Sequence, residues 1–473
     1  MHDKLLLNTI DRRNFLKKSA LSAGAVLMPG FVGGTSITLP SPAGRINIAI
    51  IGVAGRGQKA VIESMSQNVV ALCDVDKSRV EKCNSNKQGI SKQFNAAVTM
   101  HEKNGAKWFS DYRIMFEELK DKIDAVIIST PDHMHFPIAL SAINFGKHVY
   151  CETPLTHTVE EAKILAQAAK DKGIITQMGN QGHSNIGTSQ IREWIQAGIF
   201  GEIREVHSWT SRSAIWWKNC VPNPGYYRSN NGIPKSLNWN QWLGVASMRP
   251  FDPDYLPTKW KGYYDFGSGV LGEMGCHMLD AAYWGLELKV PTEIESSTII
   301  NNCYPCPVSS VVTYKFPARG NMPPVTYKWY EGGMYPPFHE IFKDDNSRTG
   351  NYQFNGSLIF GEKGSILSDL SNNNIQISPN NKFRELSKEL HSEKPRHIKE
   401  NHYKEFFNAI KGYQKASSDF SYAGPLTETV LLGTIAQRTI RKLKYDDSKS
   451  TFINNDEANK LLRKDYPKGW ILS

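Results

Sequence analysis

Short hydrophobic runs recur through the first 180 residues and alternate with amphipathic stretches. The runs lie at 45–51, 69–73, 122–129, 148–151 and 174–178. Runs of this length without polar alternation predict parallel strands that are buried on both faces. The stretches 58–66, 136–145 and 158–172 have helical periodicity. This alternation of strand and helix predicts a doubly wound α/β fold.

The pattern changes after residue 200, where strands follow one another with fewer helices between them. Strands are predicted at 203–210, 293–300, 310–316, 325–330, 357–366 and 375–378. Helices are predicted at 401–412 and at 426–443, the second beginning after Pro425. We therefore expect a second α/β domain over 181–473, after a first domain over 44–180.

The first 43 residues form a separate segment that resembles an export signal. Asp11-Arg12-Arg13-Asn14-Phe15-Leu16-Lys17-Lys18 precedes a run of small apolar residues from Ser19 to about Gly34. The arginine pair followed by Phe-Leu-Lys is similar to a twin-arginine signal, which exports folded proteins. A disordered basic tail is the alternative. The apolar run is too short to span a membrane, so we expect a periplasmic protein without stable membrane insertion.

Composition and charge favour a globular enzyme over a nucleic-acid-binding protein. The chain has 473 residues, of which 40% are hydrophobic and 22% charged, and its net charge is +10. That charge is spread along the chain and forms no long basic run. Nucleic-acid binding requires a concentrated basic surface, so we expect a small-molecule partner and no nucleic acid.

The first strand leads into a glycine-rich turn, Gly52-Val53-Ala54-Gly55-Arg56-Gly57, and then into a helix. Gly52 would make the tight turn, Ala54 occupies the position of the usual second glycine, and Gly57 would let the helix approach the strand. Asp74 ends the next strand, 22 residues after Gly52. A carboxylate there binds a ribose 2′-hydroxyl and repels a 2′-phosphate, which favours NAD over NADP. A purely structural turn is the alternative.

Polar residues follow the other predicted strands of the first domain. Ligands bind at the carboxyl ends of strands in such sheets. We therefore add these residues to the predicted cofactor site: Gly55, Arg56, Thr130, Pro131, His133, His135, Glu152, Thr153 and Gln181. Packing is a serious alternative for His135.

These motifs together resemble the Gfo/Idh/MocA oxidoreductases, the family of glucose–fructose oxidoreductase and inositol dehydrogenase. The similar stretches are 50–57, 71–76, 129–137, 148–162, 177–183, 238–244 and 267–280. The resemblance implies a Rossmann NAD-binding domain followed by an α/β domain with a large open antiparallel sheet. It also implies a homo-oligomer assembled through that sheet, and a sugar or polyol substrate.

The resemblance also implies where the catalytic groups lie. The family uses a Lys in a Glu-Lys-Pro motif, together with an Asp and a His spaced four apart. Here Glu152-Thr153-Pro154 has Thr in place of Lys, and Glu273 stands where Asp is usual, before His277. If 272–284 is one helix, Glu273, His277 and Asp280 share nearly one face. Glu273 could then orient His277 and raise its basicity, so that His277 exchanges the substrate proton.

Other readings of this cluster stay open at the level of sequence. His277 could be a buried histidine satisfied by carboxylates, or Glu273, His277 and Asp280 could hold a divalent metal. Aromatic and polar side chains are candidates for the substrate cleft, because aromatic planes pack on sugar rings and Arg binds hydroxyls or carboxylates. The candidates are His183, Arg212, Trp216, Trp217, Trp260, Tyr263 and Tyr264. Core packing is a rival explanation for each aromatic residue.

Three functions fit the sequence. The first is an NAD-dependent oxidoreductase that oxidises a secondary hydroxyl of a sugar, glycoside or polyol. The second is an enzyme that oxidises the sugar transiently with a tightly bound, recycled NAD and catalyses net hydrolysis or elimination. The third is a non-catalytic NAD- or sugar-binding protein, supported by the Thr at position 153 alone.

Overall fold

The computed structural model describes residues 44–85, 89–213, 232–300, 306–337, 355–379, 401–467 and 469–470. Pro40–Ser473 forms one compact unit. The predicted export signal, and the candidates Trp216 and Trp217, lie outside the described residues. In the part of the chain that is described, no helix combines the length and apolar character needed to cross a membrane.

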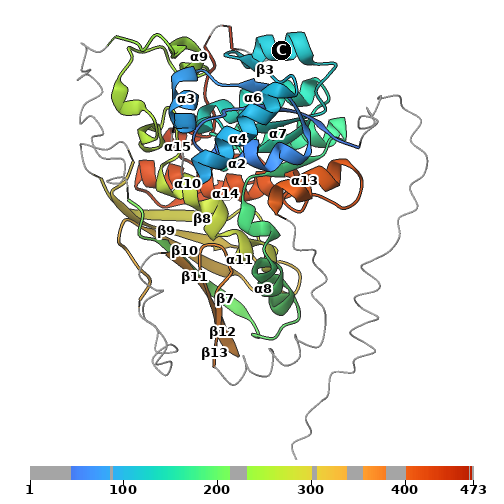
Figure 1. The fold of residues 1–473 in the computed structure, drawn as a ribbon. Helices are drawn as coiled ribbons and strands as arrows, with labels where there is room; N and C mark the ends of the chain where they lie inside the picture. Colours follow the sequence, from blue (N-terminus) through green and yellow to red (C-terminus); the bar gives the residue numbers. More distant parts are fainter. Residues whose placement is uncertain are drawn as a thin grey trace, which may run out of the picture. The chain divides into compact units, whose positions relative to one another are not determined.

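A parallel sheet occupies the first half of the described chain (Figure 1). Its strand order is β3-β2-β1-β4-β5-β6. The strands are β1 (Asn47–Ile51), β2 (Asn68–Cys73), β3 (Lys107–Phe109), β4 (Ala125–Ile128), β5 (His148–Cys151) and β6 (Thr176–Met178). Every neighbouring pair is parallel. The order reverses at β1, which starts the sheet at its centre, so ligands are expected at the carboxyl end of β1.

Helices link these strands. Three were predicted, and they appear as α2 (Gly57–Glu63), α6 (His135–Asn144) and α7 (Val159–Lys172). Thr158 begins α7, accepting from the Glu161 amide while the Glu161 carboxylate accepts from the Thr158 amide. This reciprocal capping box explains the sharp start of the helix. Three helices were not predicted, namely α3 (Lys77–Ser85), α4 (Gly89–Lys103) and α5 (Tyr112–Leu119).

A second, larger sheet has the order β13-β12-β11-β7-β10-β9-β8-β14-β15 among the described residues. Its strands are β7 (Ile203–Thr210), β8 (Glu293–Ile299), β9 (Ser309–Phe316), β10 (Val325–Glu331), β11 (Asn355–Gly361), β12 (Gly364–Ser368), β13 (Ile375–Ser378), β14 (Leu443–Asp446) and β15 (Thr451–Phe452). The pair β7–β10 is parallel, so the sheet is mixed and not wholly antiparallel. The single strand predicted at 357–366 is a hairpin that turns between Gly361 and Gly364.

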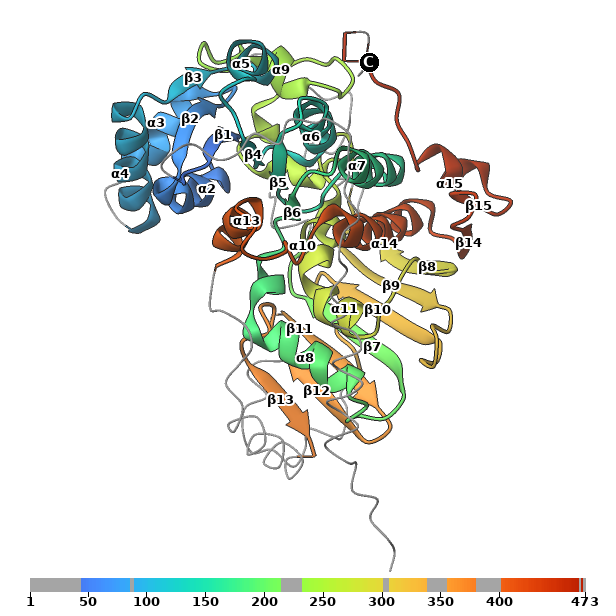
Figure 2. The ribbon, with the colours of Figure 1, turned by 90° about the vertical axis from the view of Figure 1, so that its right-hand side faces the viewer.

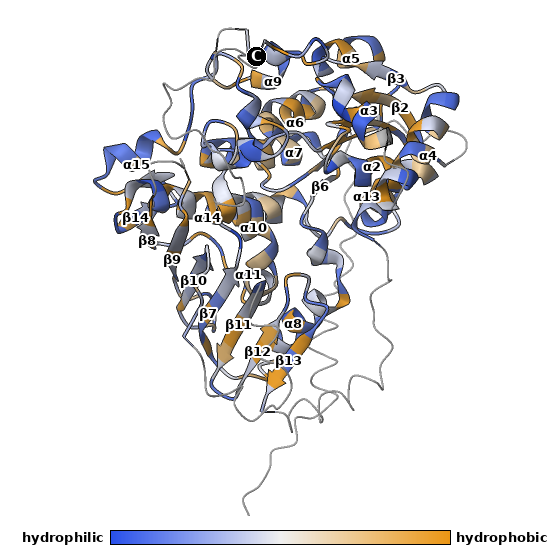
Figure 3. Cartoon of the chain, turned by 60° about the vertical axis from the view of Figure 1, so that its left-hand side comes forward, coloured by the Kyte–Doolittle hydropathy of each residue, from blue (hydrophilic) through white to orange (hydrophobic). Residues whose placement is uncertain are grey.

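One face of the second sheet packs against helices. These are α8 (Ile186–Gln196), α10 (Gly269–Met278), α11 (Asp280–Gly285) and α14 (Phe420–Thr439), as Figure 2 shows. The predicted helix 426–443 begins earlier, because Asp419 accepts from the amides of Ser421 and Tyr422, and it contains Pro425. Figure 3 shows hydrophobic residues on β12 and β13, whereas α15 (Asp456–Lys460) is hydrophilic.

The two halves are joined by segments from late in the sequence. The helix α13 (His402–Ile410) contributes Tyr403, Phe406 and Phe407 to the same hydrophobic core as Ile48 and Ile50 of β1. The helix α14 packs against α7 of the first half and against β8 and β9 of the second. The cofactor half is therefore completed by residues far beyond position 180.

Candidate active site

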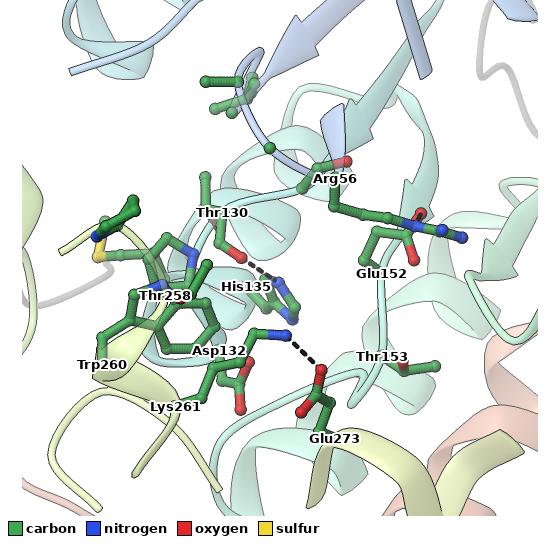
Figure 4. Close-up of a pocket in the computed structure, with 18 of the residues that line it drawn as sticks. Arg56, Thr130, Asp132, His135, Glu152, Thr153, Thr258, Trp260, Lys261 and Glu273 are labelled. Carbon is green, nitrogen blue, oxygen red and sulfur yellow. Dashed lines mark hydrogen bonds and ion pairs between the residues drawn. The ribbon is translucent and has the colours of Figure 1, made fainter. Parts of the chain in front are cut away.

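A pocket of about 530 Å³ runs from the glycine turn to the helix α10. Its walls come from the carboxyl ends of β1, β2, β4 and β5, from the loop before α10, and from α10 itself. Figure 4 shows Arg56 and Glu152 at one part of the wall, and Lys261, Glu273 and Thr153 at another. The pocket thus has the location that doubly wound sheets use for nucleotides.

The glycine turn closes so tightly that two of its positions have no space for a side chain. Gly52 has φ +82°, and a Cβ there would lie 2.7 Å from the Ser129 carbonyl. A Cβ on Gly57 would lie 1.8 Å from the Gly52 carbonyl oxygen. The first glycine therefore permits the turn and the third permits helix α2 to approach β1, as the sequence predicts.

Asp74 holds the turn in place from the end of β2. Its Oδ2 accepts from the amides of Val53 and Ala54 at 2.9 and 3.0 Å, and its Oδ1 accepts from the amide of Asp76 at 3.0 Å. Burial raises the pKa of Asp74, against the effect of these amide donors. Each carboxylate oxygen accepts more than one hydrogen bond, so Asp74 still has capacity for a ribose hydroxyl.

A network at the end of β5 fixes Glu152. Its carboxylate accepts from Arg56 Nε at 3.1 Å, from Gln181 Nε2 at 3.1 and 3.2 Å, and from the Tyr403 hydroxyl at 3.0 Å. Tyr403 stacks on Tyr150, with ring centroids 4.7 Å apart. Glu152 is therefore a fixed negative charge in the wall, and α13 supplies one of its donors.

Most of the predicted cofactor residues line the pocket. They are Gly52, Ala54, Gly55, Arg56, Asp74, Thr130, Pro131, His135, Glu152, Thr153 and Gln181. Gly57 packs behind the turn. His133 is fully buried, and its ring nitrogens bond to the carbonyls of Phe266 and Trp242 at 3.2 and 3.0 Å. His133 therefore packs between the two halves and is not a cofactor contact.

His135 lies in the pocket wall but is held on both sides. Its Nδ1 is 2.7 Å from the Pro154 carbonyl oxygen, and its Nε2 is 2.9 Å from the Thr130 carbonyl oxygen. Burial lowers the pKa of this histidine. The neutral ring that a lowered pKa favours has one N–H, so it donates to one of these carbonyls and packs against the other, between the loops after β4 and β5.

The predicted reacting end is built around His277. His277 Nε2 lies 3.1 Å from Thr153 Oγ1, so the structure joins the motif at position 153 to the helix α10. Burial lowers the pKa of His277 to about 4, which leaves the imidazole neutral at pH 7. A neutral imidazole in a pocket wall can accept a proton from a bound hydroxyl.

Glu273 pairs with two cations that the sequence did not predict as its partners. Its Oε1 pairs with Lys261 Nζ at 2.5 Å and with Arg212 Nη1 at 3.0 Å. Burial would raise the pKa of Glu273, but the charges of Lys261 and Arg212 outweigh burial and lower it. Glu273 Oε1 is therefore held by two cations. The charge of Glu273 raises the pKa of His277, as the sequence predicts, but burial lowers that pKa by more.

Asp280 and His183 face each other away from the pocket. The expected single helix 272–284 is two helices that meet at Leu279, so Asp280 starts α11. His183 Nδ1 lies 2.8 Å from Asp280 Oδ1, and the Tyr422 hydroxyl donates to the same carboxylate at 2.6 Å. Among the described residues no cluster of His, Cys, Asp or Glu could hold a metal ion. Asp280 and His183 thus bind each other and are not among the residues that line the pocket, which corrects the expectation that Asp280 shares the pocket-facing side of one helix with His277.

Some of the candidates for the substrate cleft line the pocket, and others pack in the core. Arg212 and Trp260 line the pocket. Tyr263 is buried beside Tyr255, with ring centroids 4.9 Å apart, and the Tyr264 ring packs under the Arg438 guanidinium at 4.6 Å. The two tyrosines are therefore packing residues, and core packing was the correct reading for them.

Four charged side chains in the wall were not predicted from the sequence, namely Asp76, Arg79, Asp132 and Lys261. Asp132, the fully buried end of the Thr130-Pro131-Asp132 loop, accepts from Ser268 Oγ at 3.0 Å, and burial raises its pKa to about 7. Lys261 follows Trp260, and Arg79 follows the Asp74–Asp76 segment. Asp132 could have been predicted as a site residue, because it lies in the loop after the strand β4. For Lys261 the only indication in the sequence was the preceding residue, Trp260, which was predicted to line the substrate cleft.

Comparison with known proteins decides the family. Residues 46–180 match the model described as the oxidoreductase family with an NAD-binding Rossmann fold. Residues 184–316 and 350–472 match the C-terminal α/β domain of the same family. The chain belongs to the Gfo/Idh/MocA oxidoreductase family. The first domain is thus an NAD-binding domain, and NAD is the cofactor.

Curated relatives match only parts of their own length. A levoglucosan dehydrogenase of Pseudarthrobacter phenanthrenivorans is 27% identical over 174 residues, which are 37% of this chain and 35% of the relative. A glycosyl hydrolase family 109 protein of Shewanella amazonensis is 28% identical over 217 residues, 41% of this chain and 44% of the relative. The chain thus matches less than half of the length of either relative.

Solved structures of the family share the fold over most of the chain. The WlbA dehydrogenase of Bordetella pertussis, in complex with NADH and UDP-GlcNAcA, has a TM-score of 0.55 and 15% identity. That match covers 85% of this chain and 99% of the other. An inositol dehydrogenase homologue of Azotobacter vinelandii, with NADH and myo-inositol, has a TM-score of 0.53 and 17% identity over 85% and 98% of the two chains.

Proposed function

We propose that this protein is an NAD-dependent oxidoreductase that acts on a secondary hydroxyl group of a sugar, glycoside or polyol. One observation carries the proposal: a single pocket connects the glycine turn and Asp74 with His277 and Thr153. A dinucleotide bound at the turn, with its nicotinamide towards His277, would place a hydride acceptor beside a proton acceptor. Relatives named as sugar and polyol dehydrogenases support the substrate class.

The residues of this chain fit a dinucleotide. Gly52 and Gly57 leave no room for a Cβ, so the chain makes the tight turn and the close helix–strand approach of a dinucleotide-binding turn. NAD supplies the hydride acceptor when it is bound. The chain supplies the rest, since Asp74 would hold the ribose and neutral His277, hydrogen-bonded to Thr153, would take the hydroxyl proton.

The second candidate is net hydrolysis or elimination through transient oxidation with a retained NAD. The similarity to glycosyl hydrolase family 109 proteins favours this candidate specifically. An exported enzyme would also have no ready supply of free NAD. We propose export of the folded protein to the periplasm by a twin-arginine signal, on the strength of Arg12, Arg13 and the apolar run that follows.

One experiment separates the candidates. The purified protein is denatured and the released NAD is quantified, and the native protein is incubated with a panel of glycosides, sugars and polyols. Continuous NADH formation from added NAD supports the oxidoreductase. Product without stoichiometric NADH supports the transient-oxidation enzyme. Bound NAD without turnover on any compound contradicts both and leaves the non-catalytic binding protein.

A further inference from the structure

Lys261 presents a cation to the reacting end of the pocket. It lies on η6 (Lys259–Gly262), in the loop before α10, and its side chain is 28% exposed. Its Nζ is 2.5 Å from Glu273 Oε1. Figure 4 shows the side chain lying between Asp132 and Glu273, with Thr153 across the pocket. Lys261, Thr153 and His277 all line this one pocket.

The backbone around Lys261 is fixed by close packing. A Cβ on Gly267 would lie 2.7 Å from the Lys261 Cα and 2.8 Å from its carbonyl oxygen. The Gly267 amide donates to the Tyr263 carbonyl at 2.8 Å, and the Gly267 carbonyl is 3.2 Å from His157 Nε2. The absent side chain at Gly267 lets the loop fold against η6. Lys261 is therefore held on a rigid wall, as preorganised electrostatic stabilisation requires.

The charges at this end leave a positive balance. Glu273 is paired with both Lys261 and Arg212, so one carboxylate faces two cations. Asp132 lines the same end, and burial raises its pKa to about 7, so near neutrality it carries only part of a charge. Glu152, the acid next to Thr153, is paired with Arg56. Thr153 Oγ1, which contacts His277, is a neutral hydroxyl. Positive charge at the reacting end thus comes from the Lys261 side of the pocket.

We propose that Lys261 contacts the substrate oxygen on the reacting carbon and stabilises the negative charge that develops there. The inference rests on the proposed oxidoreductase function. In the oxidation, the C–H bond breaks and its electron pair leaves as hydride to NAD⁺. The O–H proton passes to His277, and the carbonyl bond forms. Lys261 exchanges no proton with the substrate in this step.

The decisive variant is Lys261→Met, which keeps the aliphatic chain and removes the charge. We expect kcat to fall by about 10²–10³, the range seen when one stabilising donor is removed, while the Kd for NAD and the melting temperature change little. Lys259→Met is the matched control. Lys259 is two residues away, pairs with Asp254 at 2.8 Å and does not line the pocket. A Lys261→Met enzyme with kcat within threefold of the control overturns the inference.

Chemical rescue distinguishes contact with substrate from a structural role. We expect ethylammonium to raise kcat of Lys261→Ala in a saturable manner, whereas ethanol of similar size leaves it unchanged. Equal rescue by both molecules would mean that space-filling matters and would overturn the inference. A wild-type protein that binds NAD but turns over none of the panel contradicts the proposed function and the inference together. Wild-type turnover that Lys261→Met retains contradicts the inference alone.

Discussion

At the scale of single residues, a site residue was predictable from the sequence where neighbouring segments of the chain determine its position. Gly52, Gly57 and Asp74 were predictable, because the strand–turn–helix geometry and the following strand end determine their positions within 23 residues. Asp280 was not predictable from spacing, because the change of helix at Leu279 directs it to His183. Lys261 was missed because its partner Glu273 was assigned to His277.

The neutral state of His277 defines the first prediction. Replacing His277 with Ala removes the proton acceptor, and we expect turnover to fall by about two to four orders of magnitude, with the Kd for NAD unchanged. Steady-state kinetics and NAD titration measure the two effects. Because the pKa of His277 is lowered to about 4, kcat/KM of the wild type should stay high down to about pH 5 and fall below that. Near-normal turnover of the variant would reject the assigned role.

The buried carboxyl of Asp132 predicts a pH-dependent stability. Its pKa is raised to about 7 from 3.8, so the folded state keeps a proton that the unfolded chain loses near pH 4. The resulting contribution to the free energy of unfolding is present at low pH and is lost as pH rises through about 7. Denaturation at pH 5 and pH 8 should show a decline for the wild type that is roughly 2–3 kcal/mol larger than for Asp132→Asn. Equal declines would contradict a raised pKa at this position.

At the scale of elements, the buried strands were predictable, whereas the helices α3, α4 and α5 were not. The strands β1, β2, β4 and β5 are hydrophobic on both faces, so their runs stand out. The helices α3 and α4 lie in a stretch rich in Lys, Asn and Gln, which masks the few apolar residues, such as Phe94 and Val98, that α4 buries. The helix α14 contains Pro425 in its second turn, so the prediction that the helix begins after this proline placed its start too late.

The contact between α10 and α14 gives a prediction at this scale. A Cβ on Gly275 would lie 2.8 Å from Val430 Cγ2. Gly275→Ala should therefore push the two helices apart, lower the free energy of unfolding by about 1–3 kcal/mol, and lower kcat because α10 carries Glu273 and His277. Chemical denaturation and kinetics test both effects. The control is Gly232→Ala, where a Cβ meets nothing within 4 Å, and a variant as stable as this control would contradict the close contact.

At the scale of the whole molecule, the order of strands and helices predicted the fold class. It did not predict which C-terminal segments pack against segments from earlier in the chain. The pattern predicted a Rossmann domain and a second α/β domain, and both are present. The parallel pair β7–β10 was not predictable, because pairing between strands more than 100 residues apart leaves no local periodicity. The packing of α13 on the first core was missed for the same reason.

The expected homo-oligomer belongs to this scale as well. Leu358, Phe360 and Leu367 gather on the face of β11 and β12 opposite to Ile359 and Ile366, which join the helix-covered core. If subunits assemble through the second sheet, Leu367→Asp should lower the molar mass measured by light scattering after gel filtration, at unchanged secondary structure.

The control for this assembly test lies elsewhere on the same sheet. Lys444→Asp on β14 replaces an exposed side chain and should leave the molar mass unchanged. A wild type that elutes as a monomer at all concentrations would reject the oligomer directly.

The contribution of α13 to the first core has a consequence for the order of assembly during synthesis. Tyr403 and Phe406 sit under the nucleotide-binding sheet, and Tyr403 holds Glu152. While the ribosome is still translating the middle of the gene, the emerging first half lacks these groups and its core stays open. A fragment ending near residue 180 should accordingly expose apolar surface and aggregate. Acquisition of the dinucleotide must then wait until more than 400 residues have emerged.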